Sequence, residues 1–251
     1  MALKLAVIGD PVDHSASPAL HREFLKLAGT SGTYEAIRVG AGTAAHEIAR
    51  LRAAGYTGLN VTTPLKEEAF AYVDSLDAIA RASGAVNTIV FSQRRVRGYN
   101  TDGIGALGAL KAAGLASVLG ARVLVLGAGP TARATIAALV AAGARTFVWN
   151  RTVEKAEATS LALGAELWRA DGAVEAVFAT LSPGVVLPQG ALRSAVVAAP
   201  VIVDANYATR STLGADLGRD VATGMAMLEA SARASFDLFC GTVVHDVEDH
   251  E

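Results

Sequence analysis

The stretch Arg122-Val-Leu-Val-Leu-Gly-Ala-Gly-Pro-Thr-Ala132 decides the fold. Its first part, Arg122–Leu126, has the length and apolar character of a buried strand, and a pair of glycines follows directly. A helical pattern of apolar residues then covers Thr131–Ala142. Pro130 suits the first turn of that helix, where a missing N–H breaks no helical hydrogen bond. A strand, a glycine turn and a helix in this order predict a βαβ unit in a parallel sheet.

Short apolar runs alternate with helical patterns along all 251 residues. In the first half we expect the strands Leu3–Ile8, Tyr34–Val39, Gly58–Val61, Thr88–Phe91 and Val96–Tyr99, and the helices Ser17–Ala28, Thr43–Ala54, Pro64–Tyr72 and Leu76–Ser83. In the second half we expect the strands Arg122–Leu126, Thr146–Trp149, Val177–Thr180 and Val201–Asp204. The alternation predicts an α/β fold, with an N-terminal α/β domain followed by a Rossmann-type, doubly wound parallel-sheet domain.

The expected domain boundary lies in a helix after Asp102, which Gly105, Gly108 and Gly114 should loosen. The first domain is expected to comprise residues 1–103 together with C-terminal helices from about 225 to 251. The second is expected to comprise residues 104–224. The acidic C-terminal segment, Glu248–Glu251, is expected to be disordered surface.

Composition excludes several classes of function. A net charge of −2 gives no electrostatic reason to expect a nucleic acid or a membrane as partner, and Arg94-Arg95-Val-Arg97 is expected to be a solvated hairpin tip. Cys240 is the only cysteine, and the histidines show no metal-ligand spacing, so neither a disulfide nor a metal site is expected. The apolar run at the N-terminus is too short for a signal peptide, and none approaches the roughly 20 residues that span a bilayer. We therefore expect a cytoplasmic protein, either a monomer or a homodimer.

The glycine turn has the pattern G-x-G-x-x-A from Gly127 to Ala132. Its glycines allow a tight turn and a close approach of the backbone to a pyrophosphate, which the N-terminus of the following helix attracts. A glycine-rich turn without a ligand is the alternative, but the strand before it and the helix after it favour a dinucleotide site.

Asn150-Arg151-Thr152 follows the second strand of this half, about 20 residues beyond the glycine turn. An NAD site usually has an acidic residue there, whereas this chain has Arg151, Thr152 and, one turn later, Lys155. A guanidinium binds a ribose 2′-phosphate through charge-assisted hydrogen bonds. The sequence thus favours NADP(H), the alternative being ordinary surface cations at the start of a helix.

Three motifs of the first half carry polar groups suited to a small hydroxylated acid. Ser15 and Ser17 are two apart before a helix whose start Pro18 marks, which suits a carboxylate, although a plain helix cap is the alternative. In Asn60-Val-Thr-Thr-Pro-Leu-Lys66, we expect Thr63 to cap a helix that begins at Pro64. Lys66 then lies in the first turn, where the helix dipole disfavours a cation and so favours an amine suited to proton transfer. A lysine that extends into solvent is the alternative.

Asp102, in Asn100-Thr-Asp-Gly103, supplies the complementary group. A carboxylate beside Lys66 would orient the amine and share in proton transfer. Its alternative role is to cap the helix that follows, which is compatible with the first.

Together these motifs resemble the shikimate dehydrogenase family, which includes quinate dehydrogenases, over nearly the whole chain. The resemblance implies a reversible, NADPH-dependent reduction of 3-dehydroshikimate to shikimate, a precursor of aromatic amino acids, with Lys66 and Asp102 as the catalytic pair. The implied substrate-binding residues are Ser15, Ser17, Asn60, Thr62, Asn87, Tyr207 and Ser231. The expected cofactor-binding residues are Gly127, Ala128, Gly129, Pro130, Thr131, Ala132, Asn150, Arg151, Thr152, Lys155, Gly224 and Met227.

The chain departs from the family pattern at several positions. Ser231 stands where family members usually have a glutamine, Phe178 where they have an asparagine, and Pro130 where they have a glycine. Arg22 likewise replaces a common asparagine. These departures suggest a divergent member, so quinate or an aminoshikimate-type compound remains an alternative substrate. A non-catalytic NADPH-binding sensor is the alternative from another class, which the intact pair Lys66 and Asp102 disfavours.

Overall fold

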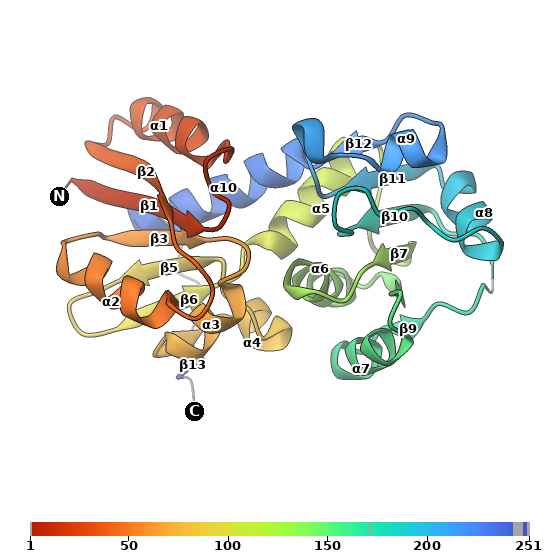
Figure 1. Cartoon of the computed structure of the whole chain (residues 1–251), viewed down its shortest axis with the longest axis horizontal. Coiled ribbons are helices and arrows are strands. Elements are labelled where there is room, and N and C mark those ends of the chain that lie inside the picture. Colours follow the sequence, from red (N-terminus) through yellow and green to blue (C-terminus); the bar gives the residue numbers. More distant parts are fainter. Residues whose placement is uncertain (1, 171, 243–247, 250–251) are drawn as a thin grey trace. The chain divides into compact units, whose positions relative to one another are not determined.

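The computed structural model describes residues 2–170, 172–242 and 248–249, which form two compact units (Figure 1). One unit contains residues 1–101 and 231–251, and the other contains residues 102–230. Asp102 and Gly103, expected in the first domain, belong to the second unit because the helix that opens it begins at Asp102. Residues 225–230 belong there too, since Met227 packs in the core of that unit.

The first unit is built on a mixed sheet with the strand order β13-β4-β6-β5-β3-β1-β2. Its elements are β1 (Leu3–Gly9), α1 (Ser17–Leu27), β2 (Gly32–Arg38), α2 (Ala44–Ala53), β3 (Gly58–Val61), α3 (Lys66–Tyr72), β4 (Ser75–Leu76), α4 (Ala78–Ser83), β5 (Thr88–Phe91), β6 (Val96–Tyr99) and β13 (Glu248–Asp249). The end of α10 (Met225–Cys240) also belongs to this unit. β1 pairs in parallel with both β2 and β3, whereas β5 runs antiparallel to β3 and β6.

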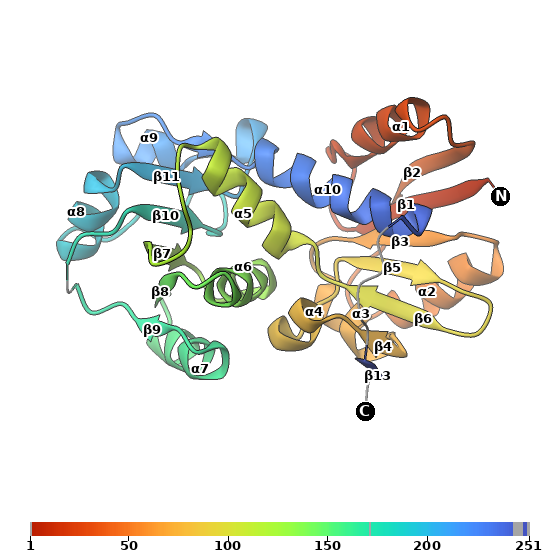
Figure 2. The ribbon, with the colours of Figure 1, turned by 180° about the vertical axis from the view of Figure 1, so that it is seen from behind.

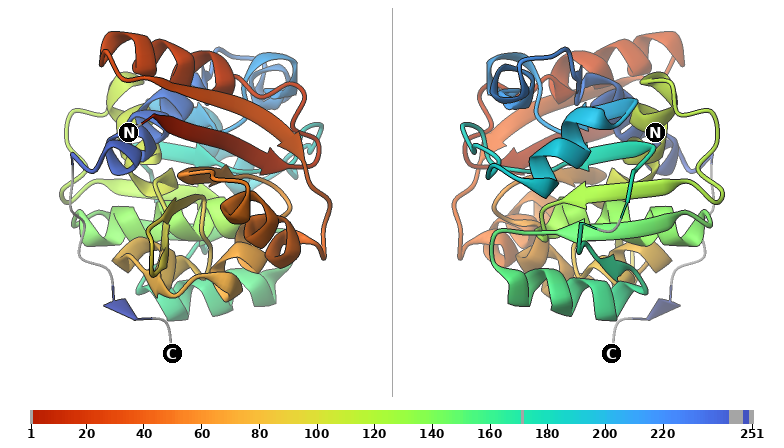
Figure 3. Two further views of the ribbon diagram at one scale, coloured as in Figure 1. Left: turned by 90° about the vertical axis from the view of Figure 1, so that its left-hand side faces the viewer. Right: turned by 90° about the vertical axis from the view of Figure 1, so that its right-hand side faces the viewer.

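Side chains of β1 alternate between the two faces of this sheet, as expected for a strand. Ala6 and Ile8 are buried with residues of α2, α3 and α4. Leu5 and Val7 are buried on the other face with Tyr34 and with Phe239 of α10, which Figure 2 shows lying across the sheet. Helices thus cover both faces of this sheet (Figure 3).

The second unit is a parallel sheet in the order β12-β11-β10-β7-β8-β9. Its elements are α5 (Asp102–Ala112), β7 (Arg122–Leu126), α6 (Pro130–Ala141), β8 (Arg145–Trp149), α7 (Val153–Leu163), β9 (Glu166–Leu167), β10 (Ala176–Ala179), α8 (Ala191–Ala198), β11 (Val201–Asp204), the 3-10 turn η1 (Ala208–Arg210), α9 (Leu213–Leu217), β12 (Ala222–Thr223) and the start of α10. Each of its strand pairs is parallel. This arrangement confirms the predicted doubly wound, Rossmann-type domain.

One face of the second sheet packs on α5, α6 and α7, and the other on α8 and α9. Phe178 of β10 is fully buried in the first of these cores. Gly108 of α5 has a packing role that its sequence context does not indicate. A Cβ at Gly108 would lie 2.8 Å from the Cβ of Ala230, so the glycine permits close packing of α5 on α10.

Two local expectations differ from the structure. Thr63 does not cap α3, which begins at Lys66 rather than Pro64, because the backbone N–H of Leu65 first closes a turn onto the carbonyl of Thr62. Glu248 and Asp249 are not disordered surface, since they form β13, which pairs antiparallel with β4. His250 and Glu251 lie outside the described residues.

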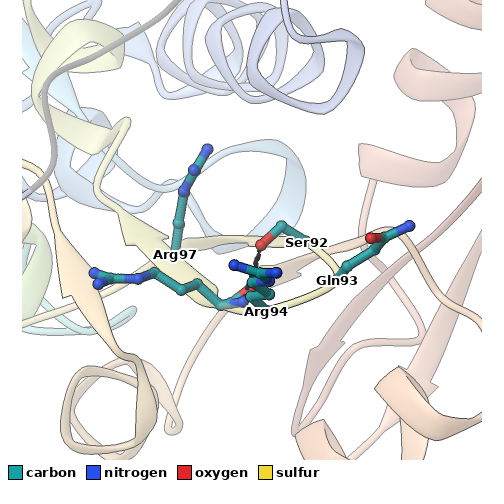
Figure 4. A pocket seen from close by; sticks show the side chains of 5 residues that line it. Ser92, Gln93, Arg94 and Arg97 are labelled. Carbon is teal, nitrogen blue, oxygen red and sulfur yellow. Dashed lines mark hydrogen bonds between the residues drawn. The ribbon is translucent and has the colours of Figure 1, made fainter.

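The hairpin tip at Arg94 is confirmed. Ser92 and Arg95 close the turn between β5 and β6 through a backbone hydrogen bond of 2.9 Å. The exposed side chains of Arg94 and Arg97 point in different directions and do not converge (Figure 4). No helix in the described part of the chain is long and apolar enough to cross a membrane.

Candidate functional site

Most of the polar residues predicted for substrate binding gather at one edge of the first sheet. The chain passes from β1 through α1 to β2, while β3 pairs on the other side of β1, so the carboxyl ends of β1 and β3 flank a topological switch point. Asn60 lies in β3, Thr62 follows it, and Asn87 directly precedes the antiparallel β5. Ser15 and Ser17 follow β1. The sheet topology thus brings these side chains to the same edge.

The Asn60 side chain is held from three sides. Its Oδ1 accepts a hydrogen bond of 2.8 Å from the Tyr34 hydroxyl. Its Nδ2 donates to Thr88 Oγ1 at 3.1 Å and to Ser235 Oγ at 3.0 Å. An amide bonded on both ends keeps a single orientation, so Asn60 is a rigid part of the edge.

Asn87 ties the edge to the segment after β6. Its Oδ1 accepts hydrogen bonds of 2.9 Å from the backbone N–H of Thr101 and from the Thr88 hydroxyl. Its Nδ2 lies 3.1 Å from Thr101 Oγ1. Thr101 Oγ1 in turn lies 2.8 Å from Ser231 Oγ of α10. Ser231, predicted from the resemblance alone, therefore joins Asn60 and Asn87 in one hydrogen-bonded network.

The sequence reasoning missed Thr88, Thr101, Ser235 and Tyr34. Ser235 is fully buried and contacts Asn60, Thr88 and Thr101. The available signal was weak: Ser231 and Ser235 are four apart, so they share one face of α10.

Ser15 and Ser17 form the corner that opens α1. Ser15 Oγ accepts a hydrogen bond of 3.3 Å from the backbone N–H of Ser17, and the N-terminal flank of α1 has no other side-chain cap. Ser17 is buried. Burial raises the pKa of Tyr34 well above its ordinary value, against a smaller opposing effect of Ser17, so the phenol stays protonated and can donate to Asn60.

Lys66 is not a lysine that extends into solvent, because its side chain is buried at 8% exposure. It is the first residue of α3, and its carbonyl accepts a hydrogen bond of 2.9 Å from Val86, the neighbour of Asn87. The Lys66 backbone is therefore tied, within the first unit, to the segment that carries Asn87. Asp102 belongs to the second unit.

The glycine turn of the second unit lies at its own switch point. β7 is flanked by β8 on one side and β10 on the other, and Gly127 follows its carboxyl end. Gly127 has a φ of +122° and donates a 2.7 Å hydrogen bond to the Trp149 carbonyl. A Cβ on Gly127 would lie 2.3 Å from Thr180 Oγ1, while one on Gly129 would meet nothing within 4 Å. The first glycine is needed for the turn itself, and the second leaves an open approach to the backbone.

This turn fits a dinucleotide. Gly129 caps α6, and Pro130 is its first residue, as predicted. The helix N-terminus directs backbone N–H groups toward the open side of Gly129. Ala132 is fully buried, which keeps α6 close to the sheet.

Asp102 is linked to this turn. It is buried at 6% exposure as the first residue of α5, and Thr131 Oγ1 donates a 3.1 Å hydrogen bond to Asp102 Oδ2. The second residue of the dinucleotide-type helix thus holds the carboxylate that sequence reasoning assigned to catalysis. No local pattern of the chain indicates this contact.

The remaining cofactor candidates follow β8. Leu126 and Trp149 are partners in the parallel register, so the segment after Trp149 lies beside the glycine turn. Arg151, Thr152 and Lys155 are exposed there, while Asn150 Nδ2 donates a 3.0 Å hydrogen bond to the carbonyl of Thr152.

Tyr207, Gly224 and Met227 also belong to the second unit. Buried Asp204 accepts hydrogen bonds from Asn206 and Ser211 and so shapes the loop that carries Tyr207. A Cβ on Gly224 would lie 2.0 Å from the Ala205 carbonyl oxygen, so this position requires glycine.

Replacing Gly127 by alanine tests the turn. We expect a loss of about 1–3 kcal/mol in the free energy of unfolding, because alanine is strained at this positive φ and meets Thr180 Oγ1. The same change in Gly29, which also has a positive φ but open space around it, is the matched control and should cost less. Urea denaturation measures both, and equal losses would contradict the proposed steric role of Thr180.

Comparison with known proteins agrees with this geometry. Residues 7–89 match the profile of the shikimate dehydrogenase substrate binding domain, and residues 109–205 match that of shikimate / quinate 5-dehydrogenase. A shikimate dehydrogenase (NADP(+)) of Methanothrix thermoacetophila is 45% identical over 161 residues, which are 64% of this chain but 59% of that protein. The aligned stretch therefore spans less than two thirds of that relative.

Solved structures align over more of their length. Shikimate dehydrogenase from Aquifex aeolicus has a TM-score of 0.83 and 31% identity, with 96% of this chain and 93% of that chain covered. Shikimate 5-dehydrogenase from Thermus thermophilus, solved in complex with NADP(H) and shikimate, has a TM-score of 0.82 and 33% identity, with 97% and 95% covered. With both of its units matched in sequence and in fold, the chain belongs to the shikimate dehydrogenase family.

Proposed function

We propose that this protein is an NADP-dependent oxidoreductase that interconverts 3-dehydroshikimate and shikimate. The observation that carries the proposal is the hydrogen-bonded polar edge of the first unit, which includes Asn60, Asn87 and Ser231. Ser15 and Ser17 follow β1, and Lys66 is the first residue of α3. The same chain has a dinucleotide-type turn in its second unit. A relative with this fold was solved with NADP(H) and shikimate, which supports the same pairing of ligands here.

The second unit would hold the dinucleotide. The backbone of Gly127–Ala132 would bind the pyrophosphate at the N-terminus of α6. Arg151, Thr152 and Lys155 would bind the ribose 2′-phosphate, with Asn150 fixing the segment through Thr152. Gly224 and Met227 complete the proposed cofactor-binding set.

The first unit would hold the substrate. Ser15 and Ser17 would bind the carboxylate, with the N-terminus of α1 behind them. Tyr207, which belongs to the second unit, is a further ligand that the resemblance implies. Asn60, Thr62, Asn87 and Ser231 would bind the ring hydroxyls. The hydrogen bonds among Asn60, Asn87 and Ser231 run through Thr88, Thr101 and Ser235, so these groups are oriented before the ligand arrives.

Lys66 and Asp102 are the proposed catalytic residues. NADPH supplies a hydride to the ring carbonyl when it is bound. The Lys66 ammonium would donate a proton to the oxygen that becomes the alkoxide, and its burial keeps water from competing for that oxygen. Asp102, held by Thr131, would orient the amine and take part in proton transfer.

A spectrophotometric assay at the NADPH absorbance band tests the proposal. Shikimate and quinate are each offered with NADP and with NAD. We expect turnover of shikimate with NADP. Turnover of quinate alone would move the assignment within the family, whereas NADPH binding without any turnover would favour a sensor.

Replacing Arg151 by alanine tests the cofactor assignment. Loss of a charge-assisted hydrogen bond at this exposed site should raise the KM for NADP about 10-fold, while the KM for NAD changes less than 2-fold. Replacing the exposed Lys111 by alanine is the charge-matched control, because it removes one cation at the end of α5. Equal effects of Arg151→Ala on both cofactors would contradict a role in binding the 2′-phosphate.

A further inference from the structure

Two serines of α10, Ser231 and Ser235, form hydrogen bonds with the polar edge of the first unit. They differ in how far they are exposed to solvent. Ser235 is fully buried, whereas Ser231 is half-buried. Both lie within hydrogen-bond distance of Thr101 Oγ1. A hydroxyl has one proton and two lone pairs, so the directions of the hydrogen bonds in this network follow from counting protons.

The count begins at Ser235. Its Oγ lies 2.8 Å from the carbonyl oxygen of Ser231, which can only accept, so Ser235 gives its proton to that carbonyl. Toward its other neighbours the oxygen of Ser235 can therefore only accept. It accepts a hydrogen bond of 3.0 Å from the side-chain amide Nδ2 of Asn60.

Thr88 is fixed in the same way. Its hydroxyl donates to Asn87 Oδ1 at 2.9 Å, so its oxygen accepts from Asn60 Nδ2 at 3.1 Å. Asn60 Nδ2 has three acceptors within reach, of which the Asn87 carbonyl is the most distant at 3.4 Å, so its two amide protons go to Ser235 and Thr88. Its Oδ1 accepts from Tyr34 and keeps a second lone pair, so Asn60 faces a ligand as an acceptor.

The last hydrogen bond of the network joins the hydroxyls of Thr101 and Ser231, and its donor can be assigned in the same way. Asn87 Oδ1 already accepts from the Thr101 backbone N–H and from Thr88, so the 3.2 Å contact of Thr101 Oγ1 with this oxygen is the weaker choice for the hydroxyl proton. The contact of Thr101 Oγ1 with Ser235 Oγ is also 3.2 Å, and the shortest of the three, 2.8 Å, is to Ser231 Oγ. Ser231 then accepts from Thr101 and keeps its own proton, and it faces a ligand as a donor.

We propose that Ser235 is a positioning residue that, through its hydrogen bond to Asn60, fixes which ligand groups this edge accepts. A ligand hydroxyl at Asn60 must donate, and a ligand oxygen at Ser231 must accept. A ring with neighbouring hydroxyl or carbonyl oxygens satisfies both. The inference rests on the proposed function for the identity of that ring, but the directions of the hydrogen bonds do not.

The first test is a spectroscopic one and needs no substrate. In the wild-type protein the side-chain NH₂ of Asn60, assigned by its absence in Asn60→Leu, should exchange slowly with water in NMR experiments. Ser235→Ala removes one of its acceptors, so this exchange should become at least about 10-fold faster. Ser160→Ala is the matched control, because Ser160 is a buried helical serine whose hydroxyl has no partner within the described residues. An unchanged exchange rate in Ser235→Ala overturns the inference, and this result does not depend on which substrate the protein uses.

The second test is kinetic. Loss of one neutral hydrogen bond that orients a ligand-binding amide should raise the KM for shikimate about 2- to 10-fold in Ser235→Ala, with kcat and the KM for NADP within about 2-fold. Ser160→Ala should change none of these. A lower kcat with an unchanged KM for shikimate would overturn the positioning role. A wild-type protein that does not turn over shikimate would refute the proposed function, while the NMR result would still decide the inference.

Discussion

Replacement of Lys66 by alanine is expected to lower kcat for shikimate by about 10²- to 10⁴-fold, the range usual for loss of a general acid. Lys66 is buried in the first unit, at the start of α3. Alanine suits a helix start, and the hydrogen bond from Val86 goes to the Lys66 backbone, so α3 should persist. The loss should therefore be one of chemistry rather than of folding.

The measurement is the rate of NADP reduction with saturating shikimate, together with NADPH affinity by fluorescence. Affinity should change less than 2-fold, since Lys66 belongs to the first unit and the glycine turn to the second. Lys111→Ala controls for the loss of one positive charge. A kcat within 10-fold of the wild type would contradict the catalytic role. If the wild-type protein turns over no substrate, and Lys66→Ala still responds to its ligand, the protein would be a non-catalytic NADPH-binding sensor.

The parts of the fold that the sequence predicted are those that local pattern determines. The strand before Gly127 and the helix after it occur where the pattern places them, because the glycine turn, Pro130 and the apolar spacing all act within a few residues. The predicted start of α3 at Pro64 was wrong, because local residue types did not determine it. Thr63 and Pro64 have the residue types of a helix cap, but the Thr62–Leu65 turn takes their place, and only the folded backbone shows it.

The contacts that orient the candidate site join residues far apart in the sequence. Asn60 and Ser235 are separated by 175 positions, and Thr101 and Ser231 by 130. Periodicity finds the face of a helix but not the strand that this face meets, so Ser235 could not be predicted. The packing role of Gly108 could not be predicted for the same reason, since it depends on Ala230 in another helix.

His21 is the most unusual buried group of the first unit. It is fully buried, and neither ring nitrogen has a hydrogen-bond partner within the described residues. Its ring stacks on Tyr34 with 4.2 Å between centroids, and Phe24, Phe236 and Phe239 surround it. Burial among these rings lowers the pKa of His21 from 6.5 to about 3, because the surroundings offer a charged imidazolium nothing in place of water.

This shift is expected to give the protein a steep loss of stability in acid, which His21→Phe should reduce. Between pH 6.5 and about 3 the unfolded chain binds a proton at His21 that the folded chain does not, so the stabilisation is complete above pH 6.5 and falls as the pH is lowered. The loss from this residue should reach about 1.4 kcal/mol per pH unit in the middle of that range. Phenylalanine keeps the ring against Tyr34 and cannot bind a proton.

The measurement is the free energy of unfolding in urea at pH 7, 6, 5 and 4.5 for both proteins. Carboxylates titrate in both alike, so the difference between the two slopes isolates His21. A constant offset between the curves reports only the packing of the larger ring. His46→Gln is the control for the loss of a histidine that is not buried, because the His46 side chain is 81% exposed. Parallel curves for wild type and His21→Phe would mean that the imidazole is protonated in the folded protein, and that its burial does not exclude the charge.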